Sequence, residues 1–269
     1  MTTPDVPHRF EIELSVPGTP EEVWRAISTG EGVSAWMMPS EIDARAGGSV
    51  VFHMGPDDKS EGRITEFDAP HRLAYEEDWA TLMGHPGADV TPLVTEFLVE
   101  AQSGGTCVVR VVTSAFGTGA DWENEFWADM LVGWGPMLDN LRLYLTHFPG
   151  QHATSMWASA TFETASPDAA IVALRDALGV HDVGSSFDAR GVAGRVERAM
   201  PRHFMLRLET PVPGFMAFSS VGDEHTSLVH LNGYLFSPSA ADYVEREHAG
   251  WQDWMNGVAA AAAPGQGAR

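Results

Sequence analysis

The residues best suited to chemistry in this chain lie in a short stretch of alternating apolar and acidic side chains. Tyr75 and Glu77 are two residues apart, so in a strand they share one face. A phenol and a carboxyl group on the wall of an apolar pocket could act as acid and base if burial raises the pKa of the carboxyl group. Glu76 and Asp78 share the opposite face, where we expect solvent. Tyr75 and Glu77 are therefore candidate catalytic residues only, because no known catalytic motif includes them.

A larger group of bulky apolar side chains could line a pocket around this pair. By strand parity or helical spacing, each of them can face the interior. Core packing explains any one of them, but together they are rich in aromatic rings and methionine, which suits an adaptable apolar pocket. The candidate ligand-binding residues are Trp36, Phe52, Met54, Tyr75, Trp79, Phe97, Trp122, Phe126, Met130, Trp134 and Met137.

Other kinds of site lack the residues that they need. Cys107 is the only cysteine and lies in an apolar run, which excludes an intramolecular disulfide and a thiolate metal cluster. His225 and His230 have no clear further ligand, and a metal ion needs three or four converging ligands. The sequence contains no phosphate loop, dinucleotide fingerprint or nucleophile elbow. We therefore expect no metal ion and no cofactor.

The charge and composition of the chain limit its partners. Sixteen basic residues against 37 acidic ones give a formal net charge of −21. Such a field repels phosphate backbones and anionic lipid, so we expect neither a nucleic acid nor a membrane as partner. No segment has the apolar length of a signal peptide or a membrane span. Together with the single cysteine and a composition typical of bacterial proteins, this predicts a cytoplasmic, acidic protein.

Alternating strand and turn signals surround the candidate residues. Thr19 is a good N-cap with Pro20 at the first helical position, which predicts a helix there, and a second short helix is expected at 33–39. An apolar stripe predicts a long helix over 121–147, with a kink near Pro136. Alternation predicts strands at 10–16, 49–54, 61–67, 73–79, 93–100 and 106–114.

The chain contains the same module twice. Four motifs recur in the same order: Thr19-Pro20 as Ser166-Pro167, Gly62-Arg63-Ile64 as Gly194-Arg195-Val196, Pro70-His71-Arg72 as Pro201-Arg202-His203, and Gly133-Trp134 as Gly250-Trp251. A repeat of this length predicts two tandem domains rather than a solenoid. We expect domains at 1–148 and 155–260 and a flexible tail at 261–269.

The second module is expected to be a degenerate copy. It has no tryptophan where Trp24, Trp36 and Trp79 stand in the first. Helices are predicted at 167–178 and 240–258, with strands at 158–164, 215–221 and 227–235 and two more within 194–210.

The predicted elements follow the order of a helix-grip fold: a strand, two short helices, a run of antiparallel strands and a long final helix. Over about residues 8–147 the sequence resembles the SRPBCC, or START-like, superfamily, in particular the branch named after the activator of the heat-shock-90 ATPase. The residues that carry the resemblance are Thr19-Pro20-Glu21-Glu22-Val23-Trp24, Trp36, Gly62-Arg63-Ile64, Pro70, Arg72, Leu73, Trp79, Gly104-Gly105-Thr106, Trp134, Leu138, Leu141 and Leu145.

This resemblance implies an α+β protein of two tandem helix-grip domains, each with a curved antiparallel sheet wrapped on a long C-terminal helix. It also implies a cavity between sheet and helix, because members of the superfamily mostly bind hydrophobic small molecules. We therefore expect the first domain to bind a small apolar or aromatic molecule and the second to be structural. Two alternatives stay open: a cyclase- or hydrolase-type enzyme that uses a pocket carboxylate, and a chaperone-interaction module. A homodimer also stays open.

Overall fold

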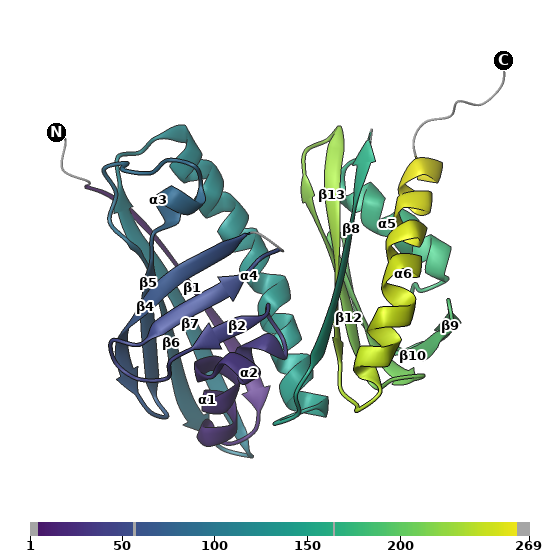
Figure 1. The fold of residues 1–269 in the computed structure, drawn as a ribbon, viewed down its shortest axis with the longest axis horizontal. Helices are drawn as coiled ribbons and strands as arrows, with labels where there is room; N and C mark the ends of the chain where they lie inside the picture. The colour runs from purple at the N-terminus through teal and green to yellow at the C-terminus, as the bar shows by residue number, and fades with distance from the viewer. Residues whose placement is uncertain (1–4, 56–57, 164, 263–269) are drawn as a thin grey trace. The chain divides into compact units, whose positions relative to one another are not determined.

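A computed structural model describes residues 5–55, 58–163 and 165–262 of the chain. It divides into two compact units, Met1–His152 and Ala153–Arg269. The division falls between residues 152 and 153, just after the linker that we expect at 148–151. Most of the expected flexible tail lies outside the described residues, although its first two residues, 261 and 262, still belong to the last helix (Figure 1).

The first unit is built on one antiparallel sheet in the order β1-β7-β6-β5-β4-β3-β2. The first strand pairs with the last, and the remaining strands follow one another as a meander away from it. The strands are β1 (Val6–Pro17), β2 (Ser40–Ile42), β3 (Ser49–His53), β4 (Lys59–Asp68), β5 (Arg72–Glu77), β6 (Leu93–Gln102) and β7 (Thr106–Gly117).

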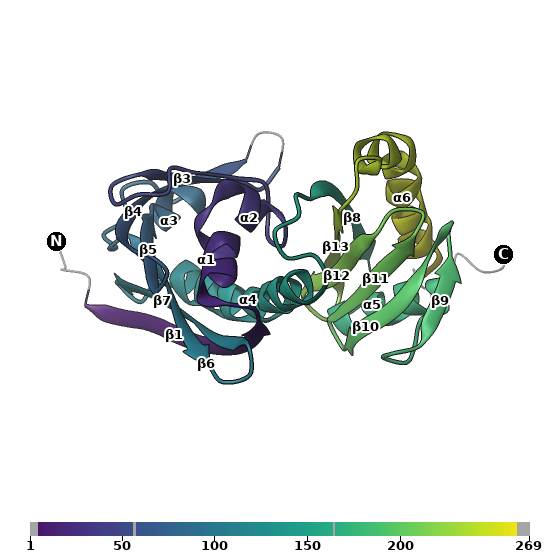
Figure 2. The same ribbon diagram turned by 90° about the horizontal axis from the view of Figure 1, so that it is seen from below.

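Four helices accompany this sheet: α1 (Pro20–Ser28), α2 (Gly30–Ser34), α3 (Trp79–Leu82) and α4 (Asp121–His147). The predicted capping box opens α1, since the Thr19 side chain accepts from the backbone of Glu22 and the Glu22 carboxylate accepts from that of Thr19. The strands of the sheet lie around α1 and α4 (Figure 2). This is the predicted grip of a curved sheet on the long final helix.

Two local predictions in the first unit are wrong. The second helix begins at Gly30 rather than near residue 33, because the Thr29 hydroxyl caps it by accepting from the backbone N–H of Gly32 at 3.0 Å. Trp79 does not extend strand β5. The Asp78 carboxylate caps the backbone of Thr81, so the chain turns into α3 at that point.

The second unit repeats the plan with six antiparallel strands in the order β8-β13-β12-β11-β10-β9. Helices α5 (Pro167–Leu178) and α6 (Ala240–Ala262) lie on one face of this sheet (Figure 1). A strand that was not predicted, β9, precedes the Gly-Arg motif, and α6 runs four residues past its expected end at 258. The strands are β8 (Thr154–Glu163), β9 (Ser186–Ala189), β10 (Val192–Met200), β11 (His203–Thr210), β12 (Gly214–Gly222) and β13 (Thr226–Leu235).

The two sheets correspond in strand order and in register around the repeated motif, which confirms the predicted pair of helix-grip domains. Ile64 of β4 pairs with Tyr75, and the matching Val196 of β10 pairs with Leu206. In each strand a bulge follows this residue. Ile64 and Val196 also exchange backbone hydrogen bonds, in the same pattern, with the two residues directly before the preceding strand, β3 or β9.

The repeated glycine of the motif marks a close approach of two strands. A Cβ on Gly62 would lie 2.6 Å from the carbonyl oxygen of Glu76, and a Cβ on Gly194 would lie 1.9 Å from that of Arg207. Both contacts are with backbone atoms of the paired strand, which can move only if the strand pairing is distorted. The glycine is therefore required by the packing of the sheet at the same point in both units.

We predict that Gly62→Ala lowers the stability of the first unit by about 1–3 kcal/mol, because the added methyl group overpacks the β4–β5 pair. Gly133→Ala is the control. Its Cβ would meet nothing within 4 Å, so the substitution should stabilise α4 by about 0.5–1 kcal/mol. Thermal denaturation followed by circular dichroism measures both. Equal effects of the two substitutions would contradict the strand contact.

Candidate functional site

The inner face of the first sheet is set by the residues that contact α4. The ring centroid of Phe10 lies 5.7 Å from that of Trp127 on α4, so Phe10 points at the helix. Directly paired residues of antiparallel strands place their side chains on the same face. Phe10 pairs with Thr113, Thr113 with Thr95, and Thr95 with Tyr75. These three polar residues therefore face the interior that α4 covers.

We call Thr113, Thr95, Tyr75 and Glu77 the polar row, since Glu77 is the next residue of β5 on the same face as Tyr75. Burial, and then the charge of Glu77, raise the pKa of Tyr75 well above its ordinary value, although a hydrogen bond with Thr95 opposes the shift. Burial also raises the pKa of Glu77, against a hydrogen bond donated by the Ser60 hydroxyl. Both candidate catalytic residues are thus held toward their neutral forms.

Two buried hydrogen-bonding atoms, one in this row and one on α4, have no partner among the described residues. They are Oγ1 of Thr113, a residue that is 0% exposed, and Nε1 of Trp127, a residue that is 8% exposed. Each unpaired polar atom costs about 1–3 kcal/mol relative to solvent. Both residues adjoin Phe10, one through strand pairing and one through ring contact. A ligand oxygen that accepts a hydrogen bond would offset this cost.

A buried carboxylate holds Trp127 in position. The imidazole of His8 stacks on the indole with centroids 5.2 Å apart, and its Nε2 lies 3.3 Å from Glu123 Oε2. Glu123 is 0% exposed and accepts hydrogen bonds from the backbone and hydroxyl of Thr118 and from the backbone of Gly119. Burial alone would raise the pKa of Glu123, but these bonds and His8 together lower it.

The second unit carries an apolar row at the same place. Met156 pairs with Gly233, Gly233 with Met216, and Met216 with Leu206, in the register that relates Phe10 to Tyr75. Leu208 stands where Glu77 stands, opposite the motif glycine. The side chains of Met156, Met216, Leu206 and Leu208 belong to one apolar core with α6. Polar atoms at these positions are therefore not needed to build the fold.

The predicted ligand-binding residues fall into three groups in the structure. Phe52, Tyr75, Phe97 and Trp134 form one chain of ring contacts through the interior. Around Trp79 gather Trp122 and Phe126 by ring contact, with Met130 packed on the same cluster. Met137 is partly buried on α4.

Two of the predicted residues are not available to a ligand in the interior. Trp36 is fully buried, and its indole N–H donates to the carbonyl of Ala26, so it joins the helices structurally. Met54 is 45% exposed, because β3 ends at His53 and the chain turns outward. Sequence reasoning also missed Thr95, Thr113, His8 and Glu123.

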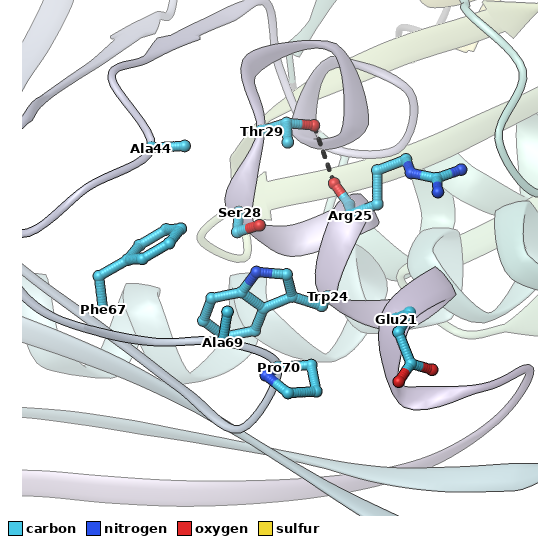
Figure 3. A pocket seen from close by; sticks show the side chains of 9 residues that line it. All are labelled: Glu21, Trp24, Arg25, Ser28, Thr29, Ala44, Phe67, Ala69 and Pro70. Carbon is cyan, nitrogen blue, oxygen red and sulfur yellow. Dashed lines mark hydrogen bonds between the residues drawn. The ribbon is translucent and has the colours of Figure 1, made fainter.

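A pocket lies elsewhere on the first unit, where none of the predicted residues stands (Figure 3). It has a volume of about 400 Å³ and lies between α1, the loop before β3, and the turn from β4 to β5. It is lined by Glu21, Trp24, Arg25, Ser28, Thr29, Ala44, Phe67, Ala69 and Pro70. Three of these residues belong to the motifs that carry the resemblance, but nothing in the sequence indicates that they converge.

A family model named "Activator of Hsp90 ATPase homolog 1-like protein" matches residues 17–146. The match runs from the end of β1 into the last turn of α4. Over these residues the first unit is similar to this family. No curated protein sequence matches the chain significantly.

The first unit contains no group of three or more possible metal ligands among its described residues. No described helix of the chain combines the length and apolar character needed to cross a membrane.

Several solved structures resemble the chain at low sequence identity. MLL2253 from Mesorhizobium loti is 17% identical with a TM-score of 0.46, and the similarity covers 52% of this chain and 98% of that one. The di-domain ARO/CYC BexL from the BE-7585A biosynthetic pathway is 14% identical with a TM-score of 0.43, over 97% and 99% of the two chains. The Aha1 dimer from Colwellia psychrerythraea is 17% identical with a TM-score of 0.41, over 51% and 96%.

The two inner carboxyl groups predict opposite pH dependences of stability. Because burial raises the pKa of Glu77, the folded first unit loses stability as pH rises above the ordinary value of 4.5. Glu77→Gln removes this titration. The variant should therefore melt higher than the wild type at pH 7, and the difference should shrink toward pH 4.

The pKa of Glu123 is lowered, so its contribution to stability is present above 4.5 and is lost as pH falls through the folded pKa. Glu123→Gln should cost about 1–3 kcal/mol at pH 7 and less at pH 4. Thermal melts of both variants across this range provide the measurement. A common pH trend for the two would contradict these assignments.

Proposed function

We propose that the first unit binds a small, largely apolar or aromatic molecule in its interior, with a polar group of that molecule against the polar row. The second unit is a structural partner without such a site. The observation that carries the proposal is the internal comparison: one copy of the fold keeps buried polar atoms where the other has only apolar side chains.

The unpartnered atoms support a ligand rather than a packing role. A buried donor without a partner costs stability, so an unpaired donor calls for a specific explanation, and the hydrogen bond of a bound ligand is one. The indole N–H of Trp127 can only donate, and the hydroxyl of Thr113 can donate or accept. A carbonyl, ether or phenol oxygen satisfies both, and the aromatic rings around it suit a ring system.

A second candidate function is acid–base catalysis on that ligand. It is favoured by the position of Glu77 beside Tyr75 and by burial, which raises the pKa of the carboxyl group in the direction that a general acid needs. A cyclase- or hydrolase-type reaction could use this pair. Loss of turnover in Glu77→Gln, with ligand affinity retained, would separate catalysis from binding.

The binding proposal predicts that a substitution at Thr113 has opposite effects on the stability of the free protein and on its affinity for the ligand. Thr113→Val keeps the shape and removes the unpaired hydroxyl, so the free protein should gain about 1–3 kcal/mol of stability. The same change should weaken ligand binding, by about tenfold for each 1.4 kcal/mol of interaction lost. Thermal melting with and without ligands from a panel of oxygenated aromatic compounds measures both effects.

The matched control is Ser227→Ala in the second unit. The Ser227 hydroxyl is also buried without a partner among the described residues, but it stands at the start of β13, outside the apolar row. This variant should gain stability and leave ligand affinity unchanged. If Thr113→Val bound every ligand as the wild type does, or if no compound shifted the melting temperature of the wild type, the proposal would fail.

A further inference from the structure

The pocket beside α1 is apolar at its base and charged at its rim. The indole of Trp24 meets the ring of Phe67 edge to face, with centroids 5.2 Å apart, and Pro70 stands beside them (Figure 3). Glu21 and Arg25, one helical turn apart on α1, border this base. The pocket is separate from the interior that the proposed function uses, so the two sites can be tested independently.

The second unit has the same contact between a helix and a turn, here between α5 and the turn from β10 to β11. An ion pair connects the two. Pro20 matches Pro167, so Glu21 matches Asp168 and Trp24 matches Ile171. The turn residues correspond through one backbone bond that both units form: Val99 donates to the carbonyl of His71, and Ser220 donates to that of Arg202.

Arg202 Nε lies 3.0 Å from Asp168 Oδ1, so in the second unit the turn is tied to the helix. In the first unit the matching turn residue is His71, and none of the described residues forms an ion pair with Glu21. The ion pair that connects helix and turn in the second unit is therefore missing among the described residues of the first unit. Glu21 has no basic side chain as its partner there.

Arg25 does not replace that missing cation. Its guanidinium turns away from Trp24 and Glu21 (Figure 3). Nη1 of Arg25 lies 3.7 Å from where a Cβ on Gly150 would stand, and its charge acts on Tyr144. The aliphatic stem of Arg25 borders the pocket, while its charge is directed to the residues after α4.

We propose that this pocket binds an organic cation with an aromatic body, of the arylalkylamine class. The ammonium group pairs with Glu21, in the place that the Arg202 guanidinium takes beside Asp168 in the second unit. The aromatic ring packs against Trp24, Phe67 and Pro70. The pocket of about 400 Å³ has room for one or two rings. The net charge of −21 favours the approach of a cation over that of an anion.

The test uses three probes of similar shape: phenethylamine, the neutral 2-phenylethanol and the anionic 3-phenylpropionate. Binding to the full chain is followed by NMR of the tryptophan indole N–H groups. We expect phenethylamine to bind at least about threefold more tightly than 2-phenylethanol, the range of an exposed ion pair, and 3-phenylpropionate to bind most weakly. Glu21→Gln should abolish the preference for the amine. Glu125→Gln, which removes the same charge from an exposed site on α4, should keep it.

Two variants that carry residues of the second unit complete the test. His71→Arg should pair with Glu21 and weaken amine binding without altering the fold, since residue 71 is exposed. Trp24→Ile should weaken all three probes by removing the ring contact. Equal affinity for the amine and the alcohol, an unchanged preference in Glu21→Gln, or the absence of any indole shift with phenethylamine would each overturn the proposal.

Discussion

A buried hydrogen-bonding atom that lacks a partner costs stability, and the two copies in this chain differ in whether they place such atoms along the inner row of the sheet. The second unit places methionine, leucine and glycine along the inner row of its sheet, so that no side-chain polar atom needs a partner there. The first unit places threonine, tyrosine and glutamate on the corresponding strands. It satisfies part of the row internally, while Thr113 Oγ1 and Trp127 Nε1 have no partner in the described part of the chain.

The arrangement of the first unit follows from holding these unpaired groups in place. Trp127 lies on α4, and the grip of the sheet brings it against β1. The stacked imidazole of His8 and the buried carboxylate of Glu123 fix the angle of its ring. A Cβ on Gly117 would lie 2.1 Å from Glu123 Oε2, so that glycine leaves the space that the carboxylate occupies. The rigid framework therefore supports a donor that the framework itself does not use.

Local signals in the sequence predict the fold well. The bounds of α4 and α5 agree with the prediction because the apolar stripe of α4 and the cap and proline that open α5 are encoded locally. Helix α3 and strand β9 were missed since each has only four residues, too few for a periodic pattern. Tandem motifs predict two domains because the glycine of each motif is required by the same close contact between strands.

The candidate site could be predicted only in part. Strand parity identifies Tyr75, Glu77 and Phe97 as inward-facing, and the structure brings them together. Single threonines in a strand carry no comparable signal, because only the register across three strands brings Thr95 and Thr113 beside Tyr75. The partner of His8 is likewise distant in sequence. Strand parity also wrongly places Met54 in the interior, since strand β3 ends one residue before it.

Native mass spectrometry of the full chain as purified tests the central claim most directly, because a ligand that satisfies the buried atoms should remain bound in the gas phase. We predict a bound small molecule at up to one copy per chain, released on denaturation. It should be reduced or lost in a Tyr75→Leu/Glu77→Leu variant that carries the side chains of the second unit. An apo mass for the wild type, together with equal responses of both proteins to added aromatic compounds, would contradict the account.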